Sequence, residues 1–274
     1  MLNSIIYGPV PSWRLGRSLG VDLLPMGGKT CSFNCIYCQL GRTTNFTTER
    51  MEFISLAQLA EELNAIAAST LSLRGASVTK QSLIADYVTF SGMGEPTLAS
   101  NLGQAIELAK SILPLPVAVL TNSSLISRED VRHDLAKADV VVAKIDAHSQ
   151  ELFAQINRPI AGLLLGDIVE GIKLFRREFR GKLCLQIMFI EANKDFAPEI
   201  AKVARSLLPD EVQLNTPLRP CPVSPLSLSE MASIKDKFDD LRNVMTVYEV
   251  SRPEVTPLNL GETLRRRPNP SSYV

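Results

Sequence analysis

Short runs of apolar residues alternate with amphipathic stretches along most of the chain. A parallel sheet whose strands are joined by helices produces this alternation, because strands covered on both faces are almost continuously apolar, whereas each covering helix has one apolar face. The runs that meet the criteria for strands span residues 18–24, 86–91, 116–121, 139–145, 184–190, 211–215 and 244–249. The pattern predicts an α/β fold of about six strand–helix units that forms a partial (β/α)6 barrel.

Signals for the start of helices fall between these runs. Ser55 followed by Gln58 forms a capping box ahead of apolar residues that recur on one helix face. The same arrangement opens helices near residues 127 and 227. The first of these runs to residue 135, and further helices are predicted over residues 165–179 and 197–208.

The chain divides into three predicted parts: an N-terminal segment over residues 1–17, a barrel core over 18–220, and a C-terminal extension over 221–274. Four prolines within residues 217–225 mark the second boundary, because proline interrupts both helices and central strands. The Ser/Thr-rich stretch 69–81 is predicted to be a loop. The tail 265–274 has three arginines, two prolines and no apolar period, so we expect it to be poorly ordered.

The balance of charges limits the kinds of partner. The 274 residues include 29 basic and 29 acidic side chains, so the formal net charge is zero. Binding along DNA needs a surplus of Lys and Arg, and we therefore expect no DNA partner. No apolar run approaches the ~18 residues that a membrane helix needs, and Gly8, Pro9 and Pro11 interrupt the N-terminus, so we expect a cytoplasmic protein with no membrane segment.

Three of the five cysteines lie close together after the first predicted strand. Cys31, Cys35 and Cys38 form a CxxxCxxC motif, which suits a metal site in a reducing compartment better than a disulfide framework. Thiolates on one short loop can converge on a soft metal centre, and three of them leave one iron of a cluster open to another ligand. The alternative is a zinc site that a distant Cys or His completes.

This motif, with the aromatic Tyr37 before its last cysteine, resembles the signature of the radical S-adenosylmethionine (SAM) superfamily. The resemblance implies that Cys31, Cys35 and Cys38 hold a 4Fe-4S cluster whose fourth iron is chelated by SAM. It also implies that Tyr37 packs beside the adenine. In this family one electron from the cluster cleaves SAM to methionine and a 5'-deoxyadenosyl radical, which abstracts a hydrogen atom from the substrate.

A second motif follows the predicted strand 86–91. The residues Ser91, Gly92, Met93, Gly94 and Glu95 are similar to the family's GGE element, which receives the amino group of SAM. Glycines allow backbone carbonyls to approach an ammonium closely, and a carboxylate adds a charge-assisted hydrogen bond. The alternative is an ordinary Gly-Pro turn that carries a surface glutamate.

Polar residues near the ends of later strands are further candidates, because ligands of parallel barrels bind at the carboxyl ends of the strands. Asn122, Lys144, Asp146 and Gln186 hold such positions. Lys144 or Asp146 would suit the carboxylate or the ribose of SAM. The alternative is that several of these side chains cap helices.

The resemblance extends to a subgroup described as wybutosine-biosynthesis-related iron-sulfur oxidoreductases. Its similar residues fall within 7–22, 29–41, 156–159 and 212–220. The family implies a reductant of the flavodoxin or ferredoxin type, and the substrate classes left open are a small molecule, a peptide or a tRNA base.

Three arginines are candidates for holding an anionic substrate. Arg14 lies in the N-terminal segment, which we expect to cross the barrel mouth, and Arg158 and Arg219 both precede proline in predicted loops. The plainer interpretation of Arg14 is a surface residue beside Trp13. The predicted function is that of a radical SAM enzyme, and the alternative is a non-enzymatic iron-sulfur or zinc protein used in electron transfer or sensing.

Overall fold

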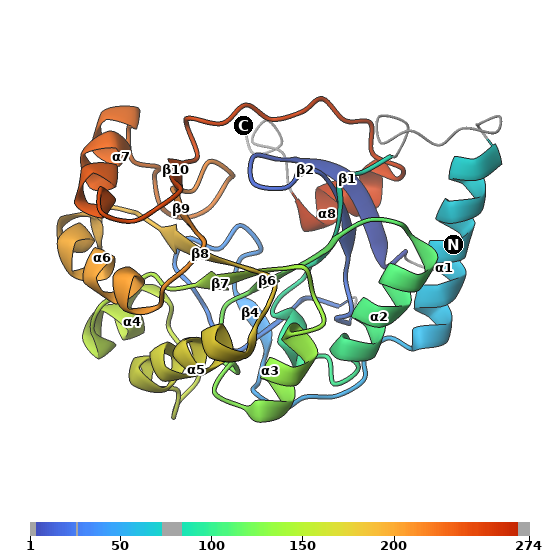
Figure 1. Cartoon of the computed structure of the whole chain (residues 1–274), viewed down its shortest axis with the longest axis horizontal. Helices are drawn as coiled ribbons and strands as arrows, with labels where there is room; N and C mark the ends of the chain where they lie inside the picture. The colour runs from blue at the N-terminus through green and yellow to red at the C-terminus, as the bar shows by residue number, and fades with distance from the viewer. Residues whose placement is uncertain (1–3, 26, 73–83, 268–274) are drawn as a thin grey trace.

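The computed structural model describes residues 4–25, 27–72 and 84–267 (Figure 1). Its main sheet has eight strands in the order β1-β2-β5-β6-β7-β8-β9-β10. All pairs are parallel except β1 and β2, which form an antiparallel hairpin at one edge. The strands are β1 (Ile6–Ser12), β2 (Gly16–Val21), β5 (Tyr87–Phe90), β6 (Val117–Thr121), β7 (Val140–Lys144), β8 (Lys182–Met188), β9 (Glu211–Asn215) and β10 (Val244–Thr246). A separate parallel pair comprises β3 (Lys29–Cys31) and β4 (Thr43–Phe46).

The sheet is curled, and most of the helices lie along its outer side (Figure 1). The helices are α1 (Leu56–Ser72), α2 (Leu102–Ile112), α3 (Glu129–Leu135), α4 (Gln150–Ile156), α5 (Leu165–Glu178), α6 (Ala197–Ser206), α7 (Leu228–Lys235) and α8 (Leu260–Arg266). This half-barrel confirms the predicted α/β fold class. None of the helices in the described ranges combines the length and the apolar character needed to span a bilayer.

Side chains that alternate along the strands enter two different cores. Val117, Val119 and Val141 face the large core that the outer helices cover. Ala118 and Val142 face a much smaller apolar cluster on the inner side, where Leu15 from the β1–β2 turn packs against them. Because the inner cluster is small, the concave side of the sheet has room for a cavity.

The two ends of the described chain meet at the β1 edge. Within the predicted N-terminal segment, residues 6–12 form an edge strand of the sheet itself, and the turn that follows them lines the cavity described below. Helix α8 and the residues just before it cover that edge: Leu258 N donates to Gly8 O, and Gly8 N donates to Thr263 Oγ1. A covered edge strand no longer offers its backbone groups to other chains.

The predicted disorder of the tail is wrong for the part of it that the structure describes. Arg266 is fully buried at the end of α8, where its Nε lies 2.8 Å from the Asp22 carboxylate. Sequence patterning missed this because the partner of the arginine lies 244 positions away in the chain. Residues 268–274 lie outside the described ranges. The predicted loop 69–81 begins inside α1, and its part from residue 73 onward is also outside them.

Candidate cofactor and substrate site

A cavity of about 310 Å³ opens on the concave side of the half-barrel. Several of its walls come from residues at or just after strand carboxyl ends, where ligands of parallel α/β barrels bind. Residues that line it from these positions are Ser91, Gly92 and Gly94 after β5, Lys144 on β7, Gln186 and Met188 on β8, and Asn215 on β9. Tyr37 and Cys38 from the cysteine loop complete one side.

The cysteine loop begins at the end of β3 and is held against α4. Asn34 N donates to Asn157 O, and Ile36 N donates to Ile156 O, each at 3.0 Å. Cys31 is buried, whereas Cys35 and Cys38 are half-buried. These backbone hydrogen bonds fix the loop where its last cysteine reaches the cavity.

The ammonium of Lys29 lies next to the three cysteines. Its Nζ is buried without a hydrogen-bond partner in the described part of the chain. Burial alone would lower the pKa of Lys29, but Cys38, Cys31 and Cys35 outweigh this effect and raise the pKa above its ordinary value. All three cysteines therefore lie close enough to Lys29 to stabilise its charge.

Two asparagine side chains donate to the sulfurs of this loop. Asn122 Nδ2 lies 3.5 Å from Cys31 Sγ, and Asn157 Nδ2 lies 3.5 Å from Cys35 Sγ. Asn122 was a predicted site residue, and its place is behind the cysteine loop instead of in the cavity wall. Asn157 was not predicted as a site residue, although it lies in the Asn-Arg-Pro stretch that carries part of the family resemblance.

The loop after β5 approaches its neighbours too closely for side chains at its glycines. A Cβ on Gly92 would lie 2.2 Å from Asp22 Cγ, and a Cβ on Gly94 would lie 1.6 Å from Thr30 O. Met93 O already accepts from Thr30 N. Gly92 and Gly94 line the cavity, whereas the Met93 carbonyl is already engaged by Thr30.

Glu95 is not a surface residue. Its carboxylate is buried and accepts hydrogen bonds from Thr97, from Thr121 Oγ1 at 2.7 Å and from Asn122 N at 2.6 Å. Burial raises the pKa of Glu95, and these donors oppose the rise. The side chain thus ties the loop after β5 to the end of β6, and it does not line the cavity.

Asp146 has a similar place behind the cavity wall. Its buried carboxylate accepts from Tyr37 Oη, from Asn157 Nδ2 at 2.7 Å and from Met188 N at 2.8 Å. Lys144 Nζ lies 3.1 Å from the same carboxylate and 4.9 Å from the centre of the Tyr37 ring. Asp146 therefore orients Tyr37 and Lys144, which themselves line the cavity.

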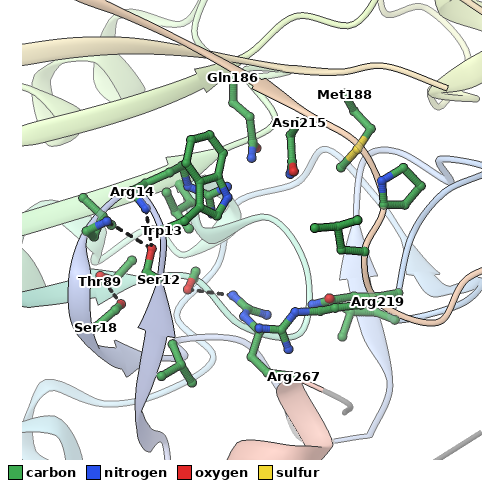
Figure 2. Close-up of a pocket in the computed structure, with 18 of the residues that line it drawn as sticks. Ser12, Trp13, Arg14, Ser18, Thr89, Gln186, Met188, Asn215, Arg219 and Arg267 are labelled. Atoms are coloured by element: carbon green, nitrogen blue, oxygen red, sulfur yellow. Dashed lines mark hydrogen bonds between the residues drawn. The ribbon is translucent and has the colours of Figure 1, made fainter. Parts of the chain in front are cut away.

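The predicted substrate arginines separate into two groups. Arg14 and Arg219 line the cavity (Figure 2), whereas Arg158 is exposed and does not. Arg252 and Arg267 also line it and were not predicted. A signal for both was present, because each precedes a proline, as Arg219 does.

Replacement of Gly94 by alanine tests the close approach of this loop. We expect Gly94→Ala to destabilise the protein by about 3 kcal/mol, since backbone atoms block the new methyl group and overpacking of this kind is costly. Thermal and urea unfolding measure the effect. Gly27→Ala is the matched control, because no atom of the described residues is found within 4 Å of its Cβ position. Equal unfolding midpoints for both variants would contradict the geometry.

A family model described as the radical SAM superfamily matches residues 27–202. A UPF0026 protein of Methanocaldococcus jannaschii is 40% identical over 220 residues, which cover 79% of this chain and 64% of that protein. The chain thus spans less than two thirds of this relative's length.

Solved structures share the fold. TYW1 with a lysine–pyruvate adduct bound superposes with a TM-score of 0.58 at 18% identity, over 82% of this chain and 73% of TYW1. Streptococcus suis SuiB bound to S-adenosylmethionine gives a TM-score of 0.56 at 14% identity, over 82% of this chain and 50% of SuiB. At these identities the likeness concerns the half-barrel and its topology.

Proposed function

Because this chain belongs to the radical SAM superfamily of enzymes, we propose that it binds a 4Fe-4S cluster through Cys31, Cys35 and Cys38 and cleaves SAM in the adjoining cavity. One observation carries the proposal. Cys31, Cys35 and Cys38 lie on a single loop and each interacts electrostatically with the buried Lys29, and Cys38 borders a cavity that the carboxyl ends of four strands line.

The cysteine loop suits a cluster chemically. Burial raises the pKa of the Cys31 thiol to about 12 and also raises the pKa of Cys35, so both stay protonated unless a metal replaces the proton. Among the described residues, no three Cys, His, Asp or Glu side chains already form a metal-binding group, so ligation would require changes of cysteine rotamer. Asn122 and Asn157 would then donate to thiolate sulfurs, and Lys29 would balance their negative charge.

The cavity wall supplies groups for SAM. The bound cluster would provide the electron that cleaves SAM to methionine and a 5'-deoxyadenosyl radical, the hydrogen-abstracting species of this family. The carbonyls of Gly92 and Gly94 would accept from the ammonium of SAM, and Tyr37 would lie beside its adenine. Lys144 and Gln186 would bind its carboxylate or ribose.

These assignments give different roles to the predicted cofactor residues. Glu95, Asn122 and Asp146 would position the groups that touch SAM, because their own polar atoms are taken up by neighbouring residues. Ser91 would likewise position its neighbours in the cavity wall. Its hydroxyl is hydrogen-bonded to Tyr7 Oη at 2.8 Å and to Arg267 at 3.0 Å.

A flavodoxin or ferredoxin would deliver the electron in the cell. We place the reaction in the cytoplasm, where free thiols such as those of the cysteine loop remain reduced and available to iron.

Anaerobic reconstitution tests the proposal. The protein is loaded with iron and sulfide, reduced with dithionite and incubated with SAM, and the products are separated by chromatography. We expect 5'-deoxyadenosine and methionine in equal amounts. A fully loaded cluster that yields no 5'-deoxyadenosine would refute the enzymatic proposal and favour the alternative, an electron-transfer or sensing protein.

A further inference from the structure

We propose that the substrate of this site is a small phosphorylated molecule, whose phosphate Arg14, Arg219, Arg252 and Arg267 bind together. This inference rests on the proposed function, because it names the substrate class of the same cavity.

The four arginines reach one cavity from four separate segments. Arg14 lies in the turn between β1 and β2, Arg219 follows β9, Arg252 lies between β10 and α8, and Arg267 follows α8. Figure 2 shows Arg14, Arg219 and Arg267 around the same space, with Gln186 and Asn215 on its other side. The arginines therefore do not form the basic face of a single helix, and only the fold brings them together.

The cavity has a strong excess of positive charge. Lys144 adds a fifth basic side chain to its lining, and no Asp or Glu among the described residues lines it. The formal net charge of the whole chain is zero, so this excess is local. Burial and the nearby cations Arg267 and Arg252 lower the pKa of both Arg14 and Arg219 to about 10.

Repulsion among these cations destabilises the arrangement, and a bound anion would relieve it. Arg14 provides a second, independent sign. Its guanidinium lies 5.3 Å from the centre of the Trp13 ring, yet its Nε is buried with no hydrogen-bond partner in the described part of the chain. A buried donor of this kind normally has an acceptor, which a phosphate oxygen would supply.

A phosphate fits this arrangement better than a carboxylate does. The carboxylate of SAM carries one negative charge on two oxygens, so it would leave most of the positive charge of the four arginines without a partner. A phosphate group has three acceptor oxygens and about two negative charges, and it can bridge several guanidinium groups at once. Because the four arginines converge on one cavity of about 310 Å³, the geometry favours a small molecule over RNA.

Calorimetry with inorganic pyrophosphate on the reconstituted protein tests the inference. We expect saturable binding at one site and about tenfold weaker binding by Arg219→Gln, which loses one charge-assisted contact. Arg252→Gln is a second variant and should also bind pyrophosphate more weakly. Because its side chain is exposed, a loss of binding by this variant would not be explained by misfolding. Arg158→Gln is the matched control, because it also precedes proline but does not line the cavity, and it should bind as the parent does.

Two results would overturn the inference. Pyrophosphate binding that does not saturate would refute the anion site. Equal affinity of the parent and its three variants for pyrophosphate would refute it as well. Transfer RNA that binds more tightly than pyrophosphate and displaces it would replace the small molecule with a nucleic acid.

The same samples are assayed for 5'-deoxyadenosine with dithionite and SAM. If the parent protein binds pyrophosphate but forms no 5'-deoxyadenosine, the proposed function is refuted and the anion site remains supported. Product formation without pyrophosphate binding would refute the anion site alone.

Discussion

Cys35→Ala should leave a folded protein that holds no 4Fe-4S cluster and forms no 5'-deoxyadenosine. Cys35 lies in the middle of the loop that the backbone of α4 residues holds in place, and its sulfur receives the amide donor of Asn157. With only two thiolates left, the cluster would lose one of its three protein ligands. Iron and sulfide content after anaerobic reconstitution, and product formation with SAM, measure the loss.

Cys221→Ala is the informative control for this prediction. Cys221 is half-buried and close enough to Cys38 for the two to interact electrostatically, which makes it the candidate for a fourth protein ligand. If only Cys31, Cys35 and Cys38 bind the cluster, the Cys221→Ala variant should still hold the cluster and cleave SAM. Loss of the metal from both variants would instead indicate a site with four cysteines, as in structural zinc proteins.

Arg266→Met should lower the free energy of unfolding by about 3–5 kcal/mol, the usual cost of leaving a buried charge without its partner. The side chains of Arg266 and Asp22 are 0% and 1% exposed, and Arg266 also donates to Ser4 O at 2.9 Å. Asp22 in turn accepts from Met93 N at 3.1 Å, so the variant should also weaken the binding of SAM. Urea unfolding and calorimetry with SAM measure the two effects.

The pH dependence of this variant has a definite sign. Burial raises the pKa of Asp22 in the parent, and Arg266 opposes that rise. Without Arg266, the folded-state pKa should rise further above the unfolded value, so the folded protein binds a proton more readily than the unfolded chain. The stability deficit relative to the parent should therefore shrink as the pH falls and grow as the pH rises through the folded-state pKa.

Two further variants separate charge from packing. The double variant Asp22→Asn/Arg266→Met removes both buried charges, and it should recover part of the lost stability. Arg265→Met removes the neighbouring arginine, whose side chain is 36% exposed, and it should cost less than about 1 kcal/mol. If Arg266→Met unfolds at the same urea concentration as the parent, the buried ion pair does not contribute to stability.

Most of the strands were predictable because their signal is local. Each of the seven predicted runs contains or overlaps a strand of the main sheet, since continuous apolar runs mark strands that are covered on both faces. The run 6–12 was missed because Gly8, Pro9 and Pro11 argue against a central strand, and they are tolerated where β1 lies at the edge of the sheet. The pair β3–β4 was missed because strands of three and four residues carry too little pattern.

The candidate site divides in the same way. The cysteine motif and the two glycines after β5 are each contained in a few consecutive residues, so the sequence alone determined their residue types, their spacing and the superfamily that they resemble. Only the tertiary structure decided that Glu95 and Asp146 are bonded within the protein, because their partners Asn122 and Tyr37 come from other elements.

Charge pairing was decided by the tertiary structure as well. The sequence alone determined that basic and acidic residues cancel, but it could not say that four arginines share one cavity or that Arg266 meets Asp22 across 244 positions. The physical reason is one of range. Strand and helix patterns arise from neighbours along the chain, whereas the surroundings of a charge depend on the order of the strands and on the return of α8 to β1.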